Sequence, residues 1–417
     1  MGVRMAVTDD VLVIGGGIAG SMAALAACEA ADRVRLLTAA PSTLGQASGL
    51  VDVLGYLPGE DRPVARPLEA IEDLPSDHPY RRVGPEAVIT GLEHFEDVVG
   101  SSYSGGERNT LVATTAGTVK PTWRYPVGVA PGTVGRECTT LLVGFSGRPR
   151  FAPELAARPL SAAGLPGAYV GRTVELPGVD AASATPDHVA RTLESGTGVR
   201  ETLADRIESL AVEADRVGLP PVLGTTAASP VRRDLAERLE TPVFELPSGP
   251  PSLPGRRLEA TLETALAEAG VRRTTGRRAV GATGEGTLES VQVEDGGRTL
   301  TYEADEFVLA TGGLVGTGVS STREVVTEPV FDCHVPHPAE RYAWFDDAPF
   351  GDHQFARFGL SVDETLRPLG PDGELEAPNL RAAGAVLGGY DFAAECSGAG
   401  VSIATGVTAG RAAGVRA

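Results

Sequence analysis

Lysine is almost absent from this chain. Lys120 is the single lysine among 36 basic residues in a sequence of 417, whereas aspartate and glutamate together number 55 and give a formal net charge of −19 at pH 7. A surface this acidic repels nucleic acid and anionic lipid, so we expect no nucleic-acid partner. The acid excess with few lysines indicates a halophilic composition, suited to a high-salt cytoplasm in which repulsion between surface charges is screened.

Cysteine is scarce as well. The four cysteines, at positions 28, 138, 333 and 396, show no Cys-x-x-Cys spacing. This argues against an iron–sulfur cluster or a zinc site in the chain and favours free thiols in a reducing compartment. The one run with metal-ligand residue types, Cys333-His334-x-x-His337, lies among prolines that indicate a loop. We therefore predict no metal site.

Long apolar stretches are missing too. No run approaches the ~18 residues that a transmembrane helix needs. Asp9 and Asp10 lead straight into the first expected strand, where a signal peptide would have its apolar segment. We therefore expect a cytoplasmic protein with no direct membrane insertion, which would reach a membrane only through a partner.

What the sequence does contain is a glycine-rich turn close to each end. Near the start, the apolar run from Val11 to Ile14 predicts a buried parallel strand, and glycines at 15, 17 and 20 follow in G-x-G-x-x-G spacing. An alanine-rich helix is expected from about Ile18 to Ala30. Gly15 permits the tight turn, Gly17 leaves room for a phosphate at the backbone, and Gly20 lets helix and strand pack closely. The helix N-terminus then favours an anion, so the motif predicts a nucleotide-binding fold.

A second glycine-rich region lies at the far end. The apolar strand from Phe307 to Ala310 runs into Thr311 and Gly312, and a turn-rich segment then leads to Cys396–Gly406, which opens a final helix of small residues. This order places a second helix N-terminus beside the first. Flavoproteins of the two-dinucleotide-fold type use such a terminus to stabilise the negative charge that a reduced flavin ring gathers near N1 and O2. Together the two ends predict a flavin cofactor.

The second expected strand, Val34 to Thr38, lacks one residue that many dinucleotide sites have. Such a strand usually ends with aspartate or glutamate, which holds the ribose hydroxyls of the adenosine. Here it ends at Thr38, and Ala39-Ala40-Pro41 follow. Either the ribose is held in another way or the flavin has no adenosine half. We predict FMN, with FAD as the alternative.

Five sequence blocks resemble the B subunit of the anaerobic glycerol-3-phosphate dehydrogenase family. They are QASGLVDVLGYLP (46–58), DHPYRRVGP (77–85), LLVGFSG (141–147), FGLSVDETLRP (358–368) and AAGAVLGGYDFAAECSGAGVSIATG (382–406). Their order matches that of the family, and the resemblance covers nearly the whole chain. The S-G-x-x-D, H-P-Y and D-E-T-L-R-P blocks are far more specific than the glycine fingerprint.

The resemblance implies a function and partners. It implies an FMN-assigned flavoprotein that pairs with a second flavoprotein, the A subunit of the same complex. An iron–sulfur protein, the C subunit, anchors the two at the membrane and passes electrons to quinone. The implied reaction converts sn-glycerol 3-phosphate, a small phosphorylated substrate, to dihydroxyacetone phosphate. The implied location is cytoplasmic, at the periphery of the cell membrane through the complex.

The glycine turns and these blocks define the candidate cofactor-binding residues. They are Gly15, Gly17, Gly20, Ser48, Gly49, Thr311, Gly312, Gly384, Gly388, Gly389, Ser397, Gly398 and Gly400.

The expected fold class is α/β, a two-dinucleotide-binding, Rossmann-like flavoprotein fold with an inserted second domain. Residues 1–75 and 241–417 are predicted to form the discontinuous flavin-binding domain. Residues 76–240 are predicted to form the inserted domain, which would serve the substrate or a partner. Within these parts we expect a helical stretch over 186–217, and an amphipathic helix over 258–269 that is followed by a β-meander ending near Tyr302.

The catalytic residues are less clearly marked. Oxidising a secondary alcohol requires a base for the hydroxyl proton and cations for the phosphate. His78 of the H-P-Y block is the candidate base. Arg367 of the D-E-T-L-R-P block is the candidate anion clamp, because an arginine fork suits phosphate. The structural alternatives are a loop histidine that caps a turn before Pro79, and an ion pair of Arg367 with Asp363 or Glu364.

Three functions remain open. The chain is a flavin-bearing component of the glycerol-3-phosphate complex, a stand-alone FAD dehydrogenase or reductase of the fumarate-reductase-like group, or a scaffold component that keeps the fold without a redox-active flavin. Three absences favour the first: no transmembrane segment, no cluster-forming cysteines, and no self-contained catalytic set. Such a chain needs other proteins to move electrons to quinone.

Overall fold

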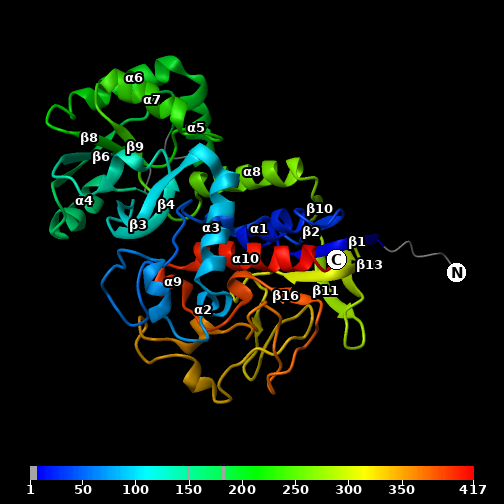
Figure 1. Cartoon of the computed structure of the whole chain (residues 1–417). Coiled ribbons are helices and arrows are strands. Elements are labelled where there is room, and N and C mark those ends of the chain that lie inside the picture. The colour runs from blue at the N-terminus through cyan, green and yellow to red at the C-terminus, as the bar shows by residue number, and fades with distance from the viewer. Residues whose placement is uncertain (1–6, 148–150, 181–183) are drawn as a thin grey trace.

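A seven-stranded sheet forms the centre of the main body (Figure 1). The computed structural model describes residues 7–147, 151–180 and 184–417. The sheet has the order β10-β2-β1-β13-β12-β11, with β16 paired to the end of β13. The pairs β10-β2, β2-β1, β1-β13 and β13-β16 are parallel. Strands β11, β12 and β13 form an antiparallel meander as predicted, but its last strand runs on to Leu309 and so includes the strand that was predicted separately over Phe307–Ala310. The strands are β1 (Val7–Ile14), β2 (Val34–Thr38), β10 (Arg272–Thr275), β11 (Arg278–Thr283), β12 (Ser290–Asp295), β13 (Arg298–Leu309) and β16 (Leu380–Ala382).

The carboxyl ends of the parallel strands meet at one edge of this sheet. Ile14 at the end of β1 is paired with Leu309 of β13 and with Leu37 of β2, and Leu309 is paired with Ala382 of β16. The predicted apolar run at the end of β1 is buried, as expected for an inner strand with parallel neighbours on both sides. All glycine turns that follow these strands therefore lie along the same edge.

Two helices of small residues pack against each other over this sheet. They are α1 (Ile18–Ala27) and α10 (Gly398–Gly414), which lie side by side in Figure 1. A Cβ added at Gly406 would lie 2.5 Å from the carbonyl oxygen of Ala19, and one added at Gly410 would lie 2.1 Å from that of Ala23. Because both residue numbers rise together, the helices are parallel. Only glycine on α10 permits an approach this close.

The inserted lobe begins later than the sequence predicted. The predicted insert starts at residue 76, but α2 (Pro79–Val83) and α3 (Pro85–Val99) pack on the main body and contribute to its core. A Cβ at Gly91 of α3 would lie 2.7 Å from Cα of Ala404, so α3 lies directly against α10. At the other end, the last strand of the lobe ends at Glu245, beyond the predicted return at 241. Residues 1–6 of the predicted first part lie outside the described residues.

The lobe has two sheets and its own apolar core. One is antiparallel, with the order β4-β3-β5, and the other is parallel, with the order β7-β6-β8-β9. The helical stretch expected over 186–217 is correct only as far as Glu208, and Gly196 divides it into two helices. Its last residues belong to the fully buried strand β8, because an inner position in a sheet outweighs the local sequence pattern. The elements are β3 (Tyr103–Ala113), β4 (Val119–Pro126), β5 (Thr133–Val134), β6 (Thr139–Phe145), β7 (Ala168–Val174), β8 (Arg216–Leu219), β9 (Val243–Glu245), α4 (Pro153–Ala162), α5 (Pro186–Ser195), α6 (Thr197–Glu208) and α7 (Ser229–Leu239).

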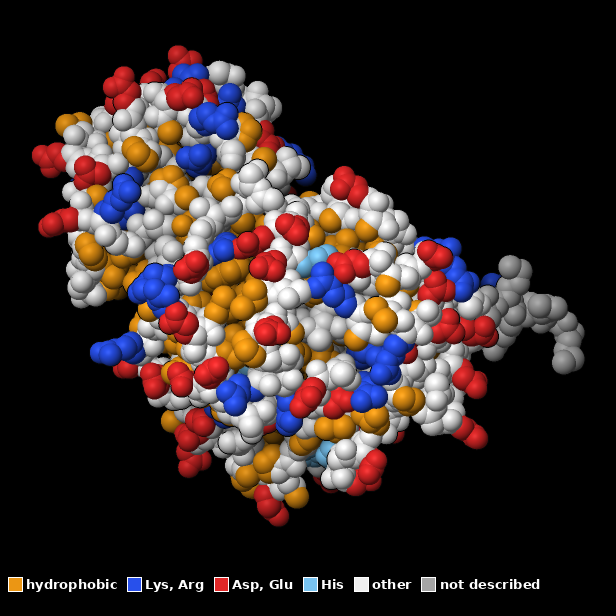
Figure 2. Space-filling view, in the orientation of Figure 1, with side chains coloured by type: hydrophobic (Ala, Val, Ile, Leu, Met, Phe, Trp, Pro, Cys, Tyr) orange, Lys and Arg blue, Asp and Glu red, His pale blue; other side chains and the backbone are white. Residues whose placement is uncertain are grey.

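Helix α8 (Leu253–Glu268) leads from the lobe back to the main sheet, and it begins five residues before the predicted amphipathic helix. Ser252 caps its N-terminus by accepting a hydrogen bond from the backbone N–H of Gly255 at 3.2 Å, and Pro254 occupies the first turn. Residues 310–379 are mostly irregular and contain the short strands β14 (Ser320–Ser321) and β15 (Val326–Thr327) and two 3₁₀ turns, Arg341–Trp344 and Gln354–Arg357. Figure 2 shows acidic side chains over both the lobe and the main body.

Candidate flavin site

The first glycine turn combines tight packing with one open position. Gly15 has φ +118°, and a Cβ there would lie 2.0 Å from the carbonyl oxygen of Ala310. A Cβ at Gly20 would lie 1.8 Å from the carbonyl oxygen of Gly15. Gly17 differs, because a Cβ there would meet nothing within 4 Å. Gly17 is also the N-cap of α1 and offers no side chain to the first turn, so open space faces the unpaired backbone N–H groups. This is the arrangement that binds a phosphate.

A polar group without a partner lies beside this turn. Thr311 follows β13, and its buried Oγ1 has no hydrogen-bond partner among the described residues. Gly312 comes next with φ +85°, and Gly384, with φ +75°, would place a Cβ 2.6 Å from that of Ala19. Buried hydroxyls normally have a partner, so the free Thr311 Oγ1 fits a site meant for a polar cofactor.

Helix α10 is parallel to α1 and extends beyond the N-terminus of α1. Gly406 is level with Ala19 near the beginning of α1, and α10 begins eight residues earlier, at Gly398. Ala19 is itself one residue beyond the start of α1, so at 1.5 Å per residue the second helix N-terminus lies about 10 Å beyond the first. Two positive helix ends at this spacing suit a cofactor with phosphates at one end and a ring that gathers negative charge at the other.

Two of the three candidate cofactor residues at the start of α10, Ser397 and Gly400, already have hydrogen-bond partners within the protein. The backbone N–H of Gly400 donates to the carbonyl oxygen of Asp52 at 2.8 Å, and a Cβ at Gly400 would lie 2.2 Å from Oη of Tyr80. Ser397 is fully buried and donates its hydroxyl hydrogen to Glu395 at 3.0 Å. Gly398 is left at the open end of the helix, so it is the residue of this group that best fits a cofactor.

The other predicted cofactor residues are spread over two places. Oγ of Ser48 accepts a hydrogen bond from the backbone N–H of Leu50 at 3.3 Å, and Gly49, with φ +78°, packs on Pro254 at the start of α8. Gly388 and Gly389 line a separate cavity of about 410 Å³. Close backbone packing explains why glycine is required there, because a Cβ on Gly389 would lie 2.6 Å from the carbonyl oxygen of Asp77.

His78 is a buried helix cap. It is the N-cap of α2, where Nδ1 accepts a hydrogen bond from the backbone N–H of Tyr80 at 3.1 Å. Nε2 lies 3.1 Å from Oε2 of Glu395, and the ring is fully buried beside Tyr80 and Tyr390. Both ring nitrogens are thus engaged inside the protein. The geometry supports a positioning role at the junction of α9 (Phe392–Glu395) and α10, and it leaves no nitrogen for a substrate proton.

Arg367 already has a carboxylate partner. Its Nε and Nη2 lie 2.8 and 2.7 Å from Oδ2 of Asp363, and its backbone N–H donates to Oδ1 of the same residue. This is the ion pair that the sequence left open as the structural alternative. The pair closes a tight loop in which Leu366 has φ +65°, so the arrangement favours a structural role over an anion clamp.

No metal centre is evident in the parts of the chain that the structure describes. Within them, no three side chains of histidine, cysteine, aspartate or glutamate lie close enough to hold an ion. Cys333 is buried, and burial raises the pKa of its thiol well above the ordinary value. Nδ1 of His337 lies 2.7 Å from the carbonyl oxygen of Val335, which accepts a hydrogen bond from it, and the ring contacts Trp344 edge-on.

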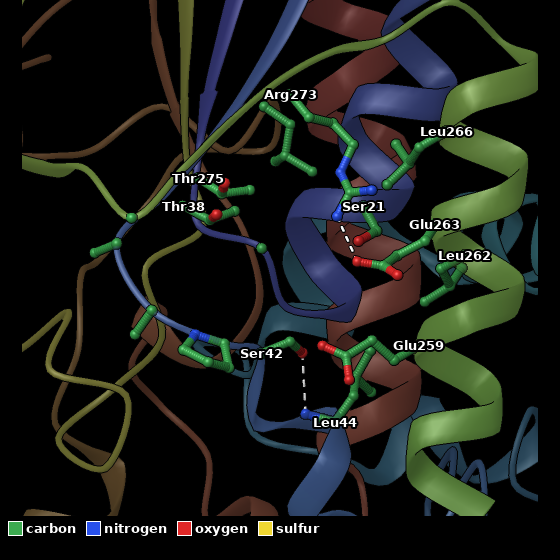
Figure 3. A pocket seen from close by; sticks show the side chains of 16 residues that line it. Ser21, Thr38, Ser42, Leu44, Glu259, Leu262, Glu263, Leu266, Arg273 and Thr275 are labelled. Atoms are coloured by element: carbon green, nitrogen blue, oxygen red, sulfur yellow. Dashed lines mark hydrogen bonds and ion pairs between the residues drawn. The ribbon is translucent and has the colours of Figure 1, made fainter. Parts of the chain in front are cut away.

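A cavity of about 290 Å³ adjoins the first glycine turn (Figure 3). It lies between the end of β2 and helix α8, and Thr38 is one of its walls. Glu259 and Glu263 of α8 line the opposite wall. Glu263 is ion-paired with Arg273, whereas Glu259 faces Ser42. Burial and the nearby charge of Glu263 raise the pKa of Glu259.

These acidic side chains were not predicted from the sequence. They belong to the predicted amphipathic helix, but nothing in the pattern shows that this helix lies against the end of a strand more than 200 residues earlier. A carboxylate is therefore present where the second strand itself lacks one.

A family model described as an FAD binding domain matches residues 10–401 of this chain. The match covers the glycine turn, the lobe and the beginning of α10. With the two helix N-termini and the open turn, it defines the class: a flavin-binding α/β protein of the two-dinucleotide-fold type. The predicted fold class is confirmed.

Named relatives narrow the class further. A protein from Halobacterium salinarum, named as a probable B subunit of anaerobic glycerol-3-phosphate dehydrogenase, is 51% identical over 98% of each chain. A protein from Pectobacterium carotovorum subsp. carotovorum, named as the B subunit of the same enzyme, is 32% identical over 94% of this chain and 96% of its own. The chain belongs to the B-subunit family of anaerobic glycerol-3-phosphate dehydrogenase, a family of oxidoreductase subunits. The family predicted from the sequence blocks is confirmed.

Two solved structures show a weaker likeness. A 3-ketosteroid-Δ4-(5α)-dehydrogenase from Rhodococcus jostii RHA1 has a TM-score of 0.40 and 14% identity, covering 99% of this chain and 98% of its own. A flavocytochrome c3 fumarate reductase in an open conformation has a TM-score of 0.43 and 13% identity, covering 98% and 78%. The family assignment rests on the sequence relatives and not on these two.

Proposed function

We propose that this chain is the flavin-bearing B subunit of a glycerol-3-phosphate dehydrogenase complex that oxidises sn-glycerol 3-phosphate to dihydroxyacetone phosphate. The observation that carries the proposal is the parallel pair of α1 and α10, whose N-termini are offset by about 10 Å beside an open glycine turn. The names of the full-length relatives support the substrate.

The chain's own residues would bind and orient the cofactor. The N–H groups at the start of α1 would hold its phosphates, and the start of α10 would favour negative charge on the ring. Thr311 Oγ1 would gain the hydrogen-bond partner that it lacks. A bound flavin supplies the acceptor for the hydride of a secondary alcohol.

The form of the flavin in this proposal is FAD. The sequence favoured FMN because the second strand lacks an acid, but the 290 Å³ cavity beyond the phosphate site is close to the lower end of the small-molecule range of about 300–1,000 Å³. That is room for the adenosine half of FAD. Glu259 would accept the hydrogen bonds of the ribose hydroxyls from α8, in place of an acid on β2. The family model, described as an FAD binding domain, supports the same choice.

Identification of the released flavin tests this proposal. The protein is purified under native conditions, denatured, and its flavin separated by chromatography, and we expect FAD. Glu259→Gln should weaken FAD binding by about 10-fold, the effect of losing one charge-assisted hydrogen bond, and leave FMN binding unchanged. Glu268→Gln, at the exposed end of the same helix, is the matched control. Release of FMN alone would restore the prediction made from the second strand, and a colourless folded protein would favour the scaffold function.

The proposed partners are a second flavoprotein, which is the A subunit of the complex, and a membrane-anchoring iron–sulfur protein, the C subunit, that delivers electrons to quinone. No helix in the described parts of the chain is both long and apolar enough to cross a membrane. The location that belongs to this proposal is the cytoplasmic side of the membrane, reached through the complex. The flavin-loaded chain alone should reduce quinone poorly, and activity should appear when these two partners are added. Full activity of the homogeneous chain would favour the stand-alone enzyme.

A further inference from the structure

The single lysine of this chain does not lie on an ordinary solvated surface. At an exposed position arginine would supply the same charge, and arginine makes up all the other basic residues. Lys120, however, lies on β4 of the lobe with only 31% of its side chain exposed, and its Nζ is 2.5 Å from Oδ2 of Asp52. A compact ammonium with three donors is what distinguishes lysine from the planar arginine fork. The site therefore calls for a reason specific to lysine.

Its partner Asp52 is buried and only half used. The residue is 8% exposed, and its Oδ1 has no hydrogen-bond partner among the described residues. Burial raises the pKa of Asp52, although the charge of Lys120 and hydrogen bonds from Lys120 and Thr122 act against the shift. Burial acts to lower the pKa of Lys120, but the carboxylate outweighs it and the pKa lies above the ordinary value. A buried charge pair with an unsatisfied oxygen is costly unless a ligand completes it.

The pair lies where the lobe meets the flavin-binding body. The carbonyl oxygen of Asp52 accepts the hydrogen bond from Gly400 in the first turn of α10. Next to Asp52, Val51 is paired in an antiparallel bridge with Arg124 of the lobe strand that also carries Lys120. The pair is thus fixed to the helix end proposed for the flavin ring, and ligand sites often form at such a boundary between two parts of a protein.

The hydrogen-bonding groups of Asp52 and Lys120 that have no partner indicate what kind of ligand would fit. Asp52 Oδ1 can accept one hydroxyl hydrogen, and the ammonium of Lys120, which has one donor directed at Asp52, retains two donors for an anionic oxygen. A molecule that offers both a hydroxyl donor and an anionic acceptor satisfies the pair. The other titratable groups that act on Lys120 are Cys396 and Tyr56, and neither supplies a positive charge.

We propose that Asp52 and Lys120 form the substrate-binding pair of this protein, with the carboxylate holding a hydroxyl group and the ammonium holding an anionic oxygen of a phosphorylated polyol. This inference rests on the proposed function and names its substrate site. It gives the acidic chain a local positive charge for an anionic ligand, where His78 and Arg367 are both engaged elsewhere.

Ligand binding to the oxidised, flavin-loaded protein, purified with the subunits that accompany it, tests the pair. Dihydroxyacetone phosphate is titrated calorimetrically, and its Kd is measured for wild type, Lys120→Met, Lys120→Arg and Asp52→Asn. Flavin content and thermal unfolding report whether each variant is folded. Arg66→Met is the matched control, because Arg66 forms an exposed ion pair with Glu69.

Lys120→Met should weaken binding by about 10-fold or more, the effect of losing a charge-assisted hydrogen bond. Lys120→Arg should weaken it less, since the charge remains, and Arg66→Met should leave it unchanged. Inorganic phosphate should compete with the ligand in wild type but not in Lys120→Met. Equal Kd values for folded, flavin-loaded wild type and both Lys120 variants would overturn the pair while the proposed function stands. No binding by wild type would overturn both.

Discussion

At the scale of single residues, the three glycines of the first turn serve two different purposes. Gly15 and Gly20 are required by packing, whereas Gly17 faces open space in front of α1. We expect Gly17→Val to fold but to lose its flavin, because the new side chain would occupy the space in which a phosphate meets the helix end. Flavin content and thermal unfolding of the purified variant are the measurements.

Gly20→Val is the matched control for that experiment. Its Cβ would lie 1.8 Å from the carbonyl oxygen of Gly15, so we expect this variant not to fold. Full flavin content in folded Gly17→Val would show that the cofactor's phosphates do not bind at the start of α1.

Asp363 makes the stability of the loop that contains Arg367 depend on pH. Burial acts to raise its pKa, but hydrogen bonds from Arg367 and Thr365 outweigh burial and lower the pKa below its ordinary value of 3.8. A carboxylate with a lowered folded-state pKa stabilises the protein above its unfolded pKa, and this contribution is lost as pH falls through the folded value. Asp363→Asn should therefore cost about 2 kcal/mol at pH 7 and less near pH 3, which lies below the ordinary pKa.

Denaturant unfolding at the two pH values measures this difference. Asp372→Asn is the control, since Asp372 is exposed and accepts a backbone hydrogen bond from Glu374 at 3.2 Å. An equal loss of stability by Asp363→Asn at both pH values would mean that the carboxylate charge does not stabilise the loop.

Residues whose chemistry is local could be predicted from the sequence. The spacing of Gly15, Gly17 and Gly20 predicts its own geometry, because a turn between a strand and a helix involves only neighbours. Glu259 could not be found in this way, since that side chain reaches the end of β2 only through the packing of α8. A catalytic His78 could not be told from a capping one either, because the answer depends on Glu395, 317 residues away.

At the scale of elements, the seam between α1 and α10 sets the spacing of the two helix ends. A Cβ on Gly410 would lie 2.1 Å from the carbonyl oxygen of Ala23, in a fully packed interface. Gly410→Leu should therefore force the helices apart and cost about 3 kcal/mol of stability, while also lowering flavin content. Thermal unfolding and flavin absorbance are the measurements.

Gly198→Leu on α6 is the matched control for the seam. It is also a glycine-to-leucine change in a helix, but Gly198 is exposed and a Cβ there would meet nothing within 4 Å. We expect little change in stability from it. Equal behaviour of the two variants would indicate that the small residues of α10 are not needed for close packing.

Most strands and helices of the main body could be predicted from hydrophobic pattern, as the agreement at β1, β2 and the meander shows. Domain membership could not. Helix α3 has an ordinary amphipathic pattern, and only its packing, such as Gly91 against Ala404, shows that it belongs with α10 and not with the lobe. Long-range packing decides which helix packs on which part of the protein, and the hydrophobic pattern of a helix does not contain that information.

At the scale of the whole molecule, charge controls stability. A net charge of −19 makes the folded chain repel itself, and the Debye length falls from about 10 Å at 0.1 M salt to about 3 Å at 1 M. We expect the Tm to rise between these two concentrations of KCl. NaCl at equal ionic strength should act alike, because screening does not depend on the cation. A Tm that falls with KCl would show that ion pairs outweigh the net repulsion.

The parallel seam of α1 and α10 also determines the order in which the chain can fold during synthesis. The lobe uses a continuous stretch from β3 to β9, so it can complete its core while the ribosome is still making the rest. Helix α1 must wait for α10, which begins about 370 residues later. At about 5–20 residues per second this delay is roughly 20–75 s. Throughout that time the first strand and helix expose apolar surface, so we expect newly made chains to need protection by chaperones until α10 has been made.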